Sequence, residues 1–364
     1  MRACTEAWAV LRPEVELIWQ KRSLTAFGDE PLEDVAHLYD LVMIDHPFCG
    51  TAEATGTLAP LDDLLGSELL ARLAADSVGA SHASYRFHGR QWGLATDAAC
   101  QVAAVRDDLL DGAPAPATWD EVRALARAQP GRVAVPLAPA QAMCAFLTLC
   151  ANAGSPAAED PARLVEPEVG LAAVELLEEL HRLGPSGALE WEQPDVLGRL
   201  TSGDELVYVP LVFGFVTYAR ADRVPSPCRF LDLPSAGAGP VGAILGGAGL
   251  AVSATSAHLE EAAAFAAFAS GAEAQRTLVG PAGGQPGSRT AWTAPELDRP
   301  ANGFFSGTSA TIEQAWVRPR ERWWPAFQRE GGQLLNRGFA AGGSPRRLLE
   351  ELDSLFLDCS RRPA

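Results

Sequence analysis

Short apolar runs rich in β-branched residues alternate along the whole chain with longer segments rich in Ala, Leu, Glu and Arg. This alternation predicts strands that alternate with helices, which is typical of an α/β fold. Residues 39–45 (YDLVMID) and 207–213 are almost wholly apolar, as expected for strands buried in a parallel sheet. No Pro/Gly/Ser-rich linker divides the 364 residues into consecutive domains. A two-lobed structure would therefore have to share segments between its lobes.

Periodicity and capping residues predict the other elements. Further strands are expected at residues 15–20, 101–106, 132–136 and 248–252. Helices are expected at residues 5–11, 32–38, 118–128, 141–150, 169–183, 258–269 and 272–279, and from Ser344-Pro345 onward. Thr118 with Glu121 predicts a capping box, and Ser270 with Glu273 predicts a second one.

The charge balance excludes several classes of protein. There are 29 basic and 46 acidic side chains, a formal net charge of −17, whereas nucleic-acid binding depends on clustered Lys and Arg. The sole lysine, Lys21, follows no glycine-rich loop, so a P-loop is excluded. Seven cysteines with no C-x-x-C pair indicate neither a disulfide framework nor a zinc site, and we expect no metal and no cofactor. No apolar run reaches the roughly 18 residues of a membrane span.

A literal G-x-G-x-x-G occurs at residues 237–242, but it contains Pro240 and leads into a predicted strand instead of a helix. We therefore interpret it as a loop and not as a dinucleotide site. Gly247 and Gly249 lie beside the end of that strand. Glycines there indicate close approach of a backbone or a ligand.

Polar residues follow several predicted strands, where ligands bind in open α/β sheets. His46 follows Asp45 directly after the strand at 39–45. The pair is open to three interpretations: an acid–base pair, with Cys49 as a conceivable nucleophile, a ligand contact, or a structural turn. Asp97 could accept hydrogen bonds from vicinal hydroxyls, pair with a cation, or cap a turn.

Two further corners leave alternatives open. Phe213-Gly214 ends a predicted strand and offers either a stacking platform or core packing. Arg318-Pro319-Arg320, followed by two tryptophans, could anchor two lobes or bind a ligand.

These pieces, in this order, resemble the carbohydrate-type (family-1) extracellular solute-binding proteins of ABC importers. The resemblance covers some 300 residues and includes KRSLTAFGDEPLEDVAHLYDLVMIDHPFCG, RQWGLATDAACQVAAVRDDLL, YVPLVFGFVTYA, AILGGAGLAVSATSAHLEEAAAFAAFAS and RPRERWWPAFQREGGQLL. It implies a two-lobed periplasmic-binding-protein-like (type II) fold. Each lobe would be a mainly parallel sheet flanked by helices, with the ligand cleft between the lobes.

The resemblance implies that residues 1–104 and 246–303 form lobe 1, and residues 105–245 and 304–364 form lobe 2 with the C-terminal helices. It also implies ligand contacts at strand ends and crossovers. The matching positions are Arg22, Ser23, His46, Phe48, Thr96, Asp97, Phe213, Gly214, Gly247, Gln285 and Arg289.

Two departures concern the N-terminus. The family begins with an export signal and a first strand, whereas this sequence starts at the following helix, TEAWAVL. We therefore expect the natural product to be longer, with an extracytoplasmic location if an export signal lies upstream. The sequence as written has no apolar signal region, so a cytoplasmic location stays open.

The leading hypothesis is a monomeric, non-catalytic protein that captures a sugar or sugar-like solute by hinge closure of two lobes and delivers it to an ABC permease. The alternative is a cytoplasmic enzyme on the same scaffold, in which His46 with Asp45 or Asp97 transfers protons. A third option is a degenerate relative that acts through protein contacts alone.

Overall fold

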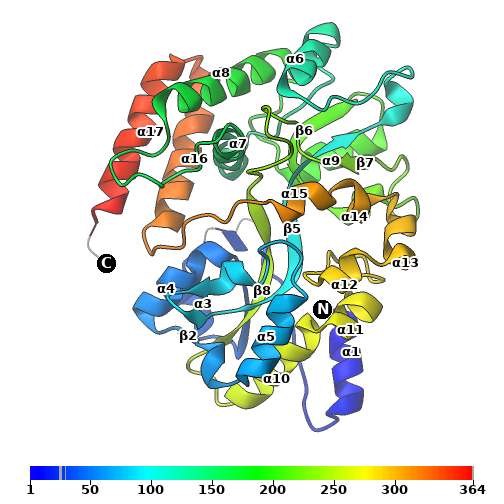
Figure 1. Cartoon of the computed structure of the whole chain (residues 1–364), viewed down its shortest axis with the longest axis vertical. Coiled ribbons are helices and arrows are strands. Elements are labelled where there is room, and N and C mark those ends of the chain that lie inside the picture. Colours follow the sequence, from blue (N-terminus) through cyan, green and yellow to red (C-terminus); the bar gives the residue numbers. More distant parts are fainter. Residues whose placement is uncertain (24–26, 29, 363–364) are drawn as a thin grey trace. The chain divides into compact units, whose positions relative to one another are not determined.

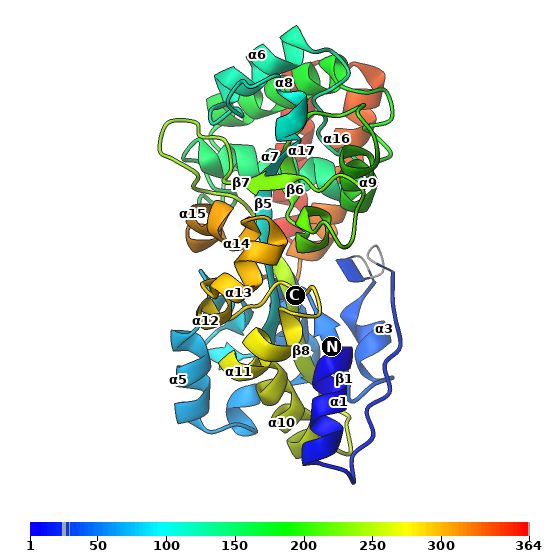
Figure 2. The same ribbon diagram turned by 90° about the vertical axis from the view of Figure 1, so that its right-hand side faces the viewer.

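The computed structural model describes residues 1–23, 27–28 and 30–362, and these form two compact units (Figures 1 and 2). Each unit combines segments that are far apart in the sequence. Unit 1 comprises Met1–Ala98, Gly246–Leu297 and Arg320–Arg322. Unit 2 comprises Ala99–Leu245, Asp298–Pro319 and Trp323–Ala364. The chain passes between the units after residues 98, 245, 297, 319 and 322, whereas the predicted lobes change over after residues 104, 245 and 303.

Unit 1 is built from short helices around a small sheet. Its helices are α1 (Arg2–Leu11), α3 (Leu32–Ala36), α4 (Cys49–Thr55), α5 (Ser67–Ala75), α10 (Leu259–Ser270), α11 (Ala272–Ala274), α12 (Arg289–Trp292) and α13 (Pro295–Asp298), with the single turns η1 (His46–Phe48), η2 (Leu61–Asp63), η3 (Ala83–Tyr85) and the π-helical η6 (Gln275–Val279). Its strands are β1 (Leu41–Ile44), β2 (Leu58–Ala59), β3 (Arg86–Phe87) and β4 (Arg90–Gln91).

Two longer strands belong to both units, because β5 (Leu94–Val105) carries the chain into unit 2 and β8 (Leu245–Ser253) carries it back. Unit 2 also contains the strands β6 (Tyr208–Phe213) and β7 (Arg229–Leu231). Its helices are α6 (Trp119–Ala128), α7 (Pro139–Asn152), α8 (Pro167–Leu183), α9 (Gln193–Ser202), α14 (Phe304–Gly307), α15 (Ser309–Glu313), α16 (Trp324–Ala341) and α17 (Pro345–Ser360), with the turns η4 (Asp107–Leu109), η5 (Val216–Ala219) and η7 (Arg299–Ala301).

The described strand ladders differ from the mainly parallel sheets that we expected. β1 pairs antiparallel with β8, so that Ile44 lies opposite Gly249. In unit 2, β5 pairs antiparallel with β6 and with β7. Parallel pairing is found at isolated bridges such as Ile244 with Trp316. β6 is buried along nearly all its length, as its apolar run predicted, whereas in β1 only Val42 and Ile44 are buried. Burial by itself does not determine strand direction.

Two apolar clusters form the core of unit 1. One contains Trp8 of α1 and Phe265 of α10, whose rings lie 5.8 Å apart, and Figure 2 shows these two helices side by side. The other contains Ile44 of β1, Val35 of α3 and Phe48. In unit 2, α7 packs against α16, which also packs against α17 (Figure 1). The nearly uncharged sequence of α7 explains why it is buried along most of its length.

Three local predictions are wrong. Residues 15–20 form no strand, because they pair with no described neighbour; Leu17 packs partly on the core while Ile18 is 84% exposed. Residues 132–136 contribute only an isolated bridge at Val133. Ser270 does not cap α11, whose N-cap is Gly271 and which continues into a π-helical turn.

Two predicted helix starts are confirmed. Thr118 and Glu121 form the predicted capping box of α6. α17 begins with Pro345 at its first position, after Ser344 as N-cap. All seven cysteines are buried free thiols. Among the described residues, none of the helices has the length and apolar character needed to cross a membrane.

Candidate functional site

Four of the predicted site residues lie together in unit 1, where β5 and β8 are neighbours in the sheet. Thr96 donates its hydroxyl hydrogen to the carbonyl of Ala248, over 3.2 Å. Gly247, with φ of +109°, brings its backbone against the backbone of Asp97, so closely that a Cβ would overlap the Asp97 carbonyl oxygen. The predicted close approach at this glycine is therefore present, and its partner is a neighbouring backbone.

Gln285 completes this group from the loop before α12. Its backbone N–H donates to Asp97 Oδ1 over 3.4 Å, and its side-chain amide donates to the carbonyl of Ala98 over 3.0 Å. Its carbonyl in turn accepts the Ala98 N–H. These three hydrogen bonds fix the loop to the strand. Gln285 contacts Asp97 through Oδ1.

The environment of Asp97 favours its neutral form. Burial raises the pKa of the carboxyl to about 6, and the Gln285 N–H and the N-terminal ammonium oppose that rise only in part. The side chain therefore changes charge near pH 6. It can accept hydrogen bonds from hydroxyl groups when ionised and donate one when protonated.

His46 lies in the turn η1, directly after β1. Asp45 caps this turn by accepting the His46 backbone N–H over 2.8 Å, and its Oδ1 lies 3.2 Å from Nδ1 of the ring. The imidazole is fully buried. The carboxylate beside His46 is therefore that of Asp45. Asp97 belongs to β5, which is separated from β1 by β8 in the sheet.

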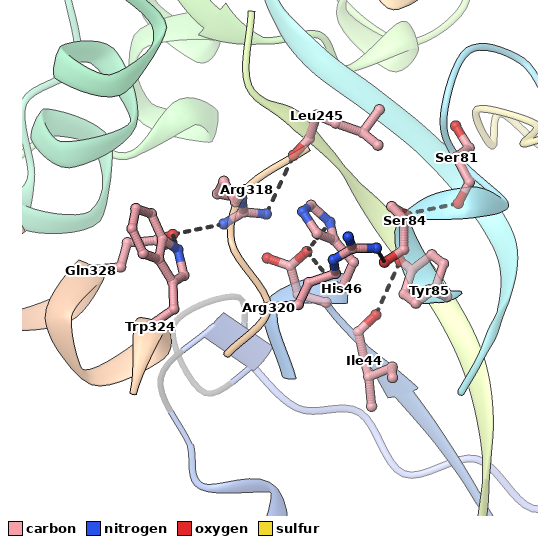
Figure 3. Close-up of polar contacts among 11 residues, drawn as sticks. Ile44, His46, Ser81, Ser84, Tyr85, Leu245, Arg318, Arg320, Trp324 and Gln328 are labelled. Carbon is pink, nitrogen blue, oxygen red and sulfur yellow. Dashed lines mark hydrogen bonds and ion pairs between the residues drawn. The ribbon is translucent and has the colours of Figure 1, made fainter. Parts of the chain in front are cut away.

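Tyr85 is a residue of this region that the sequence did not reveal. Its ring meets the His46 ring edge-on, with centroids 6.3 Å apart, and its hydroxyl donates to the carbonyl of Ile44 over 3.3 Å (Figure 3). The ring also packs on Gly249, where a Cβ would lie 2.7 Å from it. Gly249 was the available signal, but a glycine does not identify the side chain that covers it.

Arg22 and Ser23 follow the extended segment at the N-terminus. Arg22 donates from Nη2 to the carbonyl of Met43 over 2.9 Å and from Nη1 to Glu30 over 3.2 Å. Ser23 is exposed, and its carbonyl accepts the N–H of Phe27. The Arg22 guanidinium is thus attached to β1, two residues before Asp45.

Two other predicted residues of unit 1 have different surroundings. Phe48 is buried in the apolar cluster around β1 and α3. Arg289 is the first residue of α12 and is exposed, and its N–H donates to the carbonyl of Asp76. Neither position is brought to Asp97 by a described contact.

Phe213 and Gly214 lie in unit 2, at the end of β6. Phe213 pairs with Gln101, and the N–H of Gly214 donates to the carbonyl of Cys100 over 3.2 Å. A Cβ at Gly214 would lie 3.0 Å from the ring of Phe304. This corner is apolar and close-packed, in contrast to the polar strand ends of unit 1.

The described residues contain no group of three or more His, Cys, Asp or Glu side chains placed as metal ligands. Unit 2 has an open groove of about 670 Å³ between α16 and α17. Its lining is charged and includes the surface ion pair of Arg347 with Glu351. None of the predicted site residues lines it.

The chain is similar to known proteins both in sequence and in fold. Residues 33–301 match the profile of a family described as bacterial extracellular solute-binding protein. No curated protein matches the chain.

Many solved structures share the fold. The maltose-bound MalE3 of T. maritima has a TM-score of 0.81 and 19% identity, over 98% of this chain and 94% of that one. The GacH receptor of Streptomyces glaucescens, solved unliganded and with acarbose, has a TM-score of 0.80 and 16% identity, over 100% and 95%. An ABC transporter solute-binding protein of Agrobacterium vitis with bound D-mannitol has a TM-score of 0.80 and 18% identity, over 98% and 94%.

Proposed function

The chain belongs to the bacterial extracellular solute-binding proteins, and from this premise we propose that its ligand is a sugar or a sugar alcohol. The protein captures this solute by closure of two lobes and delivers it to an ABC permease. It works outside the cytoplasm, as its family does, and as a monomer.

The observation that carries the proposal is the group formed by Thr96 and Asp97 within β5, Gly247 near the start of β8, and Gln285 in the loop before α12. One carboxylate, held by a backbone N–H and flanked by an amide, suits the vicinal hydroxyls of a polyol. The similar structures named above were solved with maltose, acarbose and D-mannitol, and these ligands share such hydroxyl pairs. Arg22 and His46 of unit 1, and the aromatic corner at Phe213 and Gly214 of unit 2, are further proposed contacts, with Ser23, Phe48 and Arg289.

The enzyme alternative has no observation in its favour. The imidazole of His46 is fully buried and packs on Tyr85, and its neighbouring carboxylate caps the same turn. Burial also raises the pKa of the Cys49 thiol far above its usual range, so the thiol stays protonated and is a poor nucleophile.

A panel of mono- and disaccharides and sugar alcohols, screened by thermal shift and then by calorimetry, tests the proposal. We expect one class of polyol to raise the melting temperature, because a ligand that binds only the folded state stabilises it. Asp97→Asn should weaken binding of that ligand by about tenfold. The control Asp120→Asn changes an exposed carboxylate in the first turn of α6 and should leave the affinity unchanged. Binding of amino acids or peptides with no response to any polyol would contradict the proposal.

A further inference from the structure

Arg318 and Arg320 are separated by one proline, yet they belong to different units. Arg318 is 3% exposed and lies in unit 2. Its guanidinium donates to Gln328 Oε1 over 3.1 Å and to the carbonyl of Leu245 over 3.3 Å. The Trp324 indole donates to the same Gln328 oxygen (Figure 3). Arg318 is therefore a structural anchor that holds the first residue of β8.

Arg320 makes a separate set of contacts within unit 1. Its Nη1 donates to three carbonyls around η3, those of Ala83 and Ser84 over 3.3 Å each and that of Arg86 over 2.6 Å. The guanidinium carbon also lies 5.8 Å from the centre of the Phe87 ring. A fixed fork of N–H donors suits such a group of carbonyls better than a flexible ammonium does.

The backbone of Arg320 holds a second turn. Its carbonyl oxygen accepts the N–H of Gly50 over 2.8 Å, at the start of α4. A Cβ at position 50 would overlap this oxygen and would lie 3.0 Å from the N atom of Arg322. The close approach of the two backbones therefore requires glycine at position 50.

The two turns held by Arg320 carry the two rings that meet in the candidate site. Gly50 follows His46 by one helical turn, and Tyr85 is the last residue of η3. Their rings are in edge-to-face contact, and the dashed lines of Figure 3 join Arg320 to the η3 region and Tyr85 to Ile44. One residue, from a segment more than 200 positions away, thus contacts both turns that carry these rings.

We propose that Arg320 is a positioning residue for solute binding. It touches no ligand, and it sets the relative placement of His46 and Tyr85 by holding the turn η1–α4 through its carbonyl and the turn η3 through its guanidinium. The part of this inference that concerns affinity rests on the proposed function. The part that concerns the two turns does not require any ligand.

The ligand-free test compares Arg320→Ala, Arg320→Lys and Arg322→Ala. Arg322 is the matched control because it lies in the same segment, and its side chain forms a long, half-exposed ion pair with Glu33, at 3.7 Å. Hydrogen exchange should accelerate in Arg320→Ala at residues 46–52 and 83–87 and stay unchanged in α16 and α17. The ring protons of His46, assigned by comparison with His46→Gln, should shift in the NMR spectrum of Arg320→Ala and return partly in Arg320→Lys.

The ligand test uses the polyol identified by the panel screen. Arg320→Ala should weaken its binding by about tenfold, Arg320→Lys by less, and Arg322→Ala not at all. Should Arg320→Ala fail to fold, Arg320→Lys still decides, because it must show smaller changes of the same kind at both turns. Unchanged exchange and unchanged His46 signals in both Arg320 variants would overturn the proposal, as would weakened binding with unaltered His46 signals. If no polyol binds the wild type, the proposed function fails while the ligand-free measurements still test the positioning role.

Discussion

The turn after β1 and the turn after β6 are both rich in aromatic residues and glycine, but their glycines serve different neighbours. Gly50 lies against a backbone carbonyl, that of Arg320, within unit 1. Gly214 lies against an aromatic side chain, that of Phe304, within unit 2. A backbone fixed at several points cannot move aside, whereas a ring can rotate or shift. The same residue type is therefore expected to be indispensable in one turn and replaceable in the other.

The largest expected effect is that of Gly50→Ala. The new Cβ overlaps the Arg320 carbonyl, and relief requires the release of a segment held by three further hydrogen bonds. We expect the free energy of unfolding to fall by about 3 kcal/mol or more, as measured by urea denaturation. A loss below about 1 kcal/mol would show that the segment moves freely.

Gly214→Ala should cost less, about 1–2 kcal/mol, because the ring of Phe304 can give way. The comparison is sharpened by a double variant, in which Phe304→Leu provides room for the added methyl group. The two substitutions should be non-additive, with the loss from Gly214→Ala reduced in the Phe304→Leu background. Strict additivity would indicate that the ring is not the obstacle.

A second difference between the units is electrostatic, because the polar strand ends of unit 1 include a carboxyl group with a raised pKa. The pKa of Asp97 is about 6 in the folded protein, against 3.8 for the ordinary group. The folded state therefore binds this proton more tightly than the unfolded state does. The resulting stabilisation is complete below pH 4 and is lost as the pH rises through 6.

The melting temperature of the wild type relative to Asp97→Asn should accordingly rise as the pH falls from 7 to 4. His82, whose pKa burial lowers to about 4, acts in the opposite sense, but it does so in both proteins and cancels in the difference. A difference that is constant with pH would show that Asp97 has an ordinary pKa.

The smallest effects concern the starts of two helices of unit 2, α6 and α17. Thr118→Ala removes a capping box in which Thr118 Oγ1 and Glu121 each accept a backbone N–H, and it should cost about 1 kcal/mol. Ser344→Ala should change stability by less than about 0.5 kcal/mol, since the Ser344 side chain makes no capping hydrogen bond. Thermal unfolding of each variant beside the wild type measures both changes. An equal cost at the two positions would contradict the assigned cap geometry.

The elements that were predictable from the sequence are those specified locally. The capping box at Thr118 and the apolar helix α7 each depend on neighbouring residues. Residues 15–20 show the limit, since strand formation requires a partner with which to pair and the alternation of side chains does not supply one. The apolar runs likewise could not determine the direction of pairing with β8.

The candidate site was predictable only in part, for a related reason. His46, which follows β1, is indicated by the local pattern. Asp97 was expected beyond a strand end but lies inside β5, because the strand begins before it, at Leu94. The contacts of Tyr85 with Gly249 and of Gly50 with Arg320 join segments more than 160 residues apart. Gly249 and the Arg318-Pro319-Arg320 corner were visible as unusual positions, but the residues opposite them are determined by tertiary packing.

The proposed function requires reversible binding of a polyhydroxylated solute without chemical change. The most direct measurement is calorimetric titration of the wild type with the polyol selected in the panel screen, followed by mass spectrometry of the ligand after long incubation and release. We predict saturable one-to-one binding that is weakened in Asp97→Asn, and a ligand recovered with unaltered mass. A product formed by the wild type and not by His46→Ala would contradict the account and identify the Asp45–His46 pair as an acid–base site.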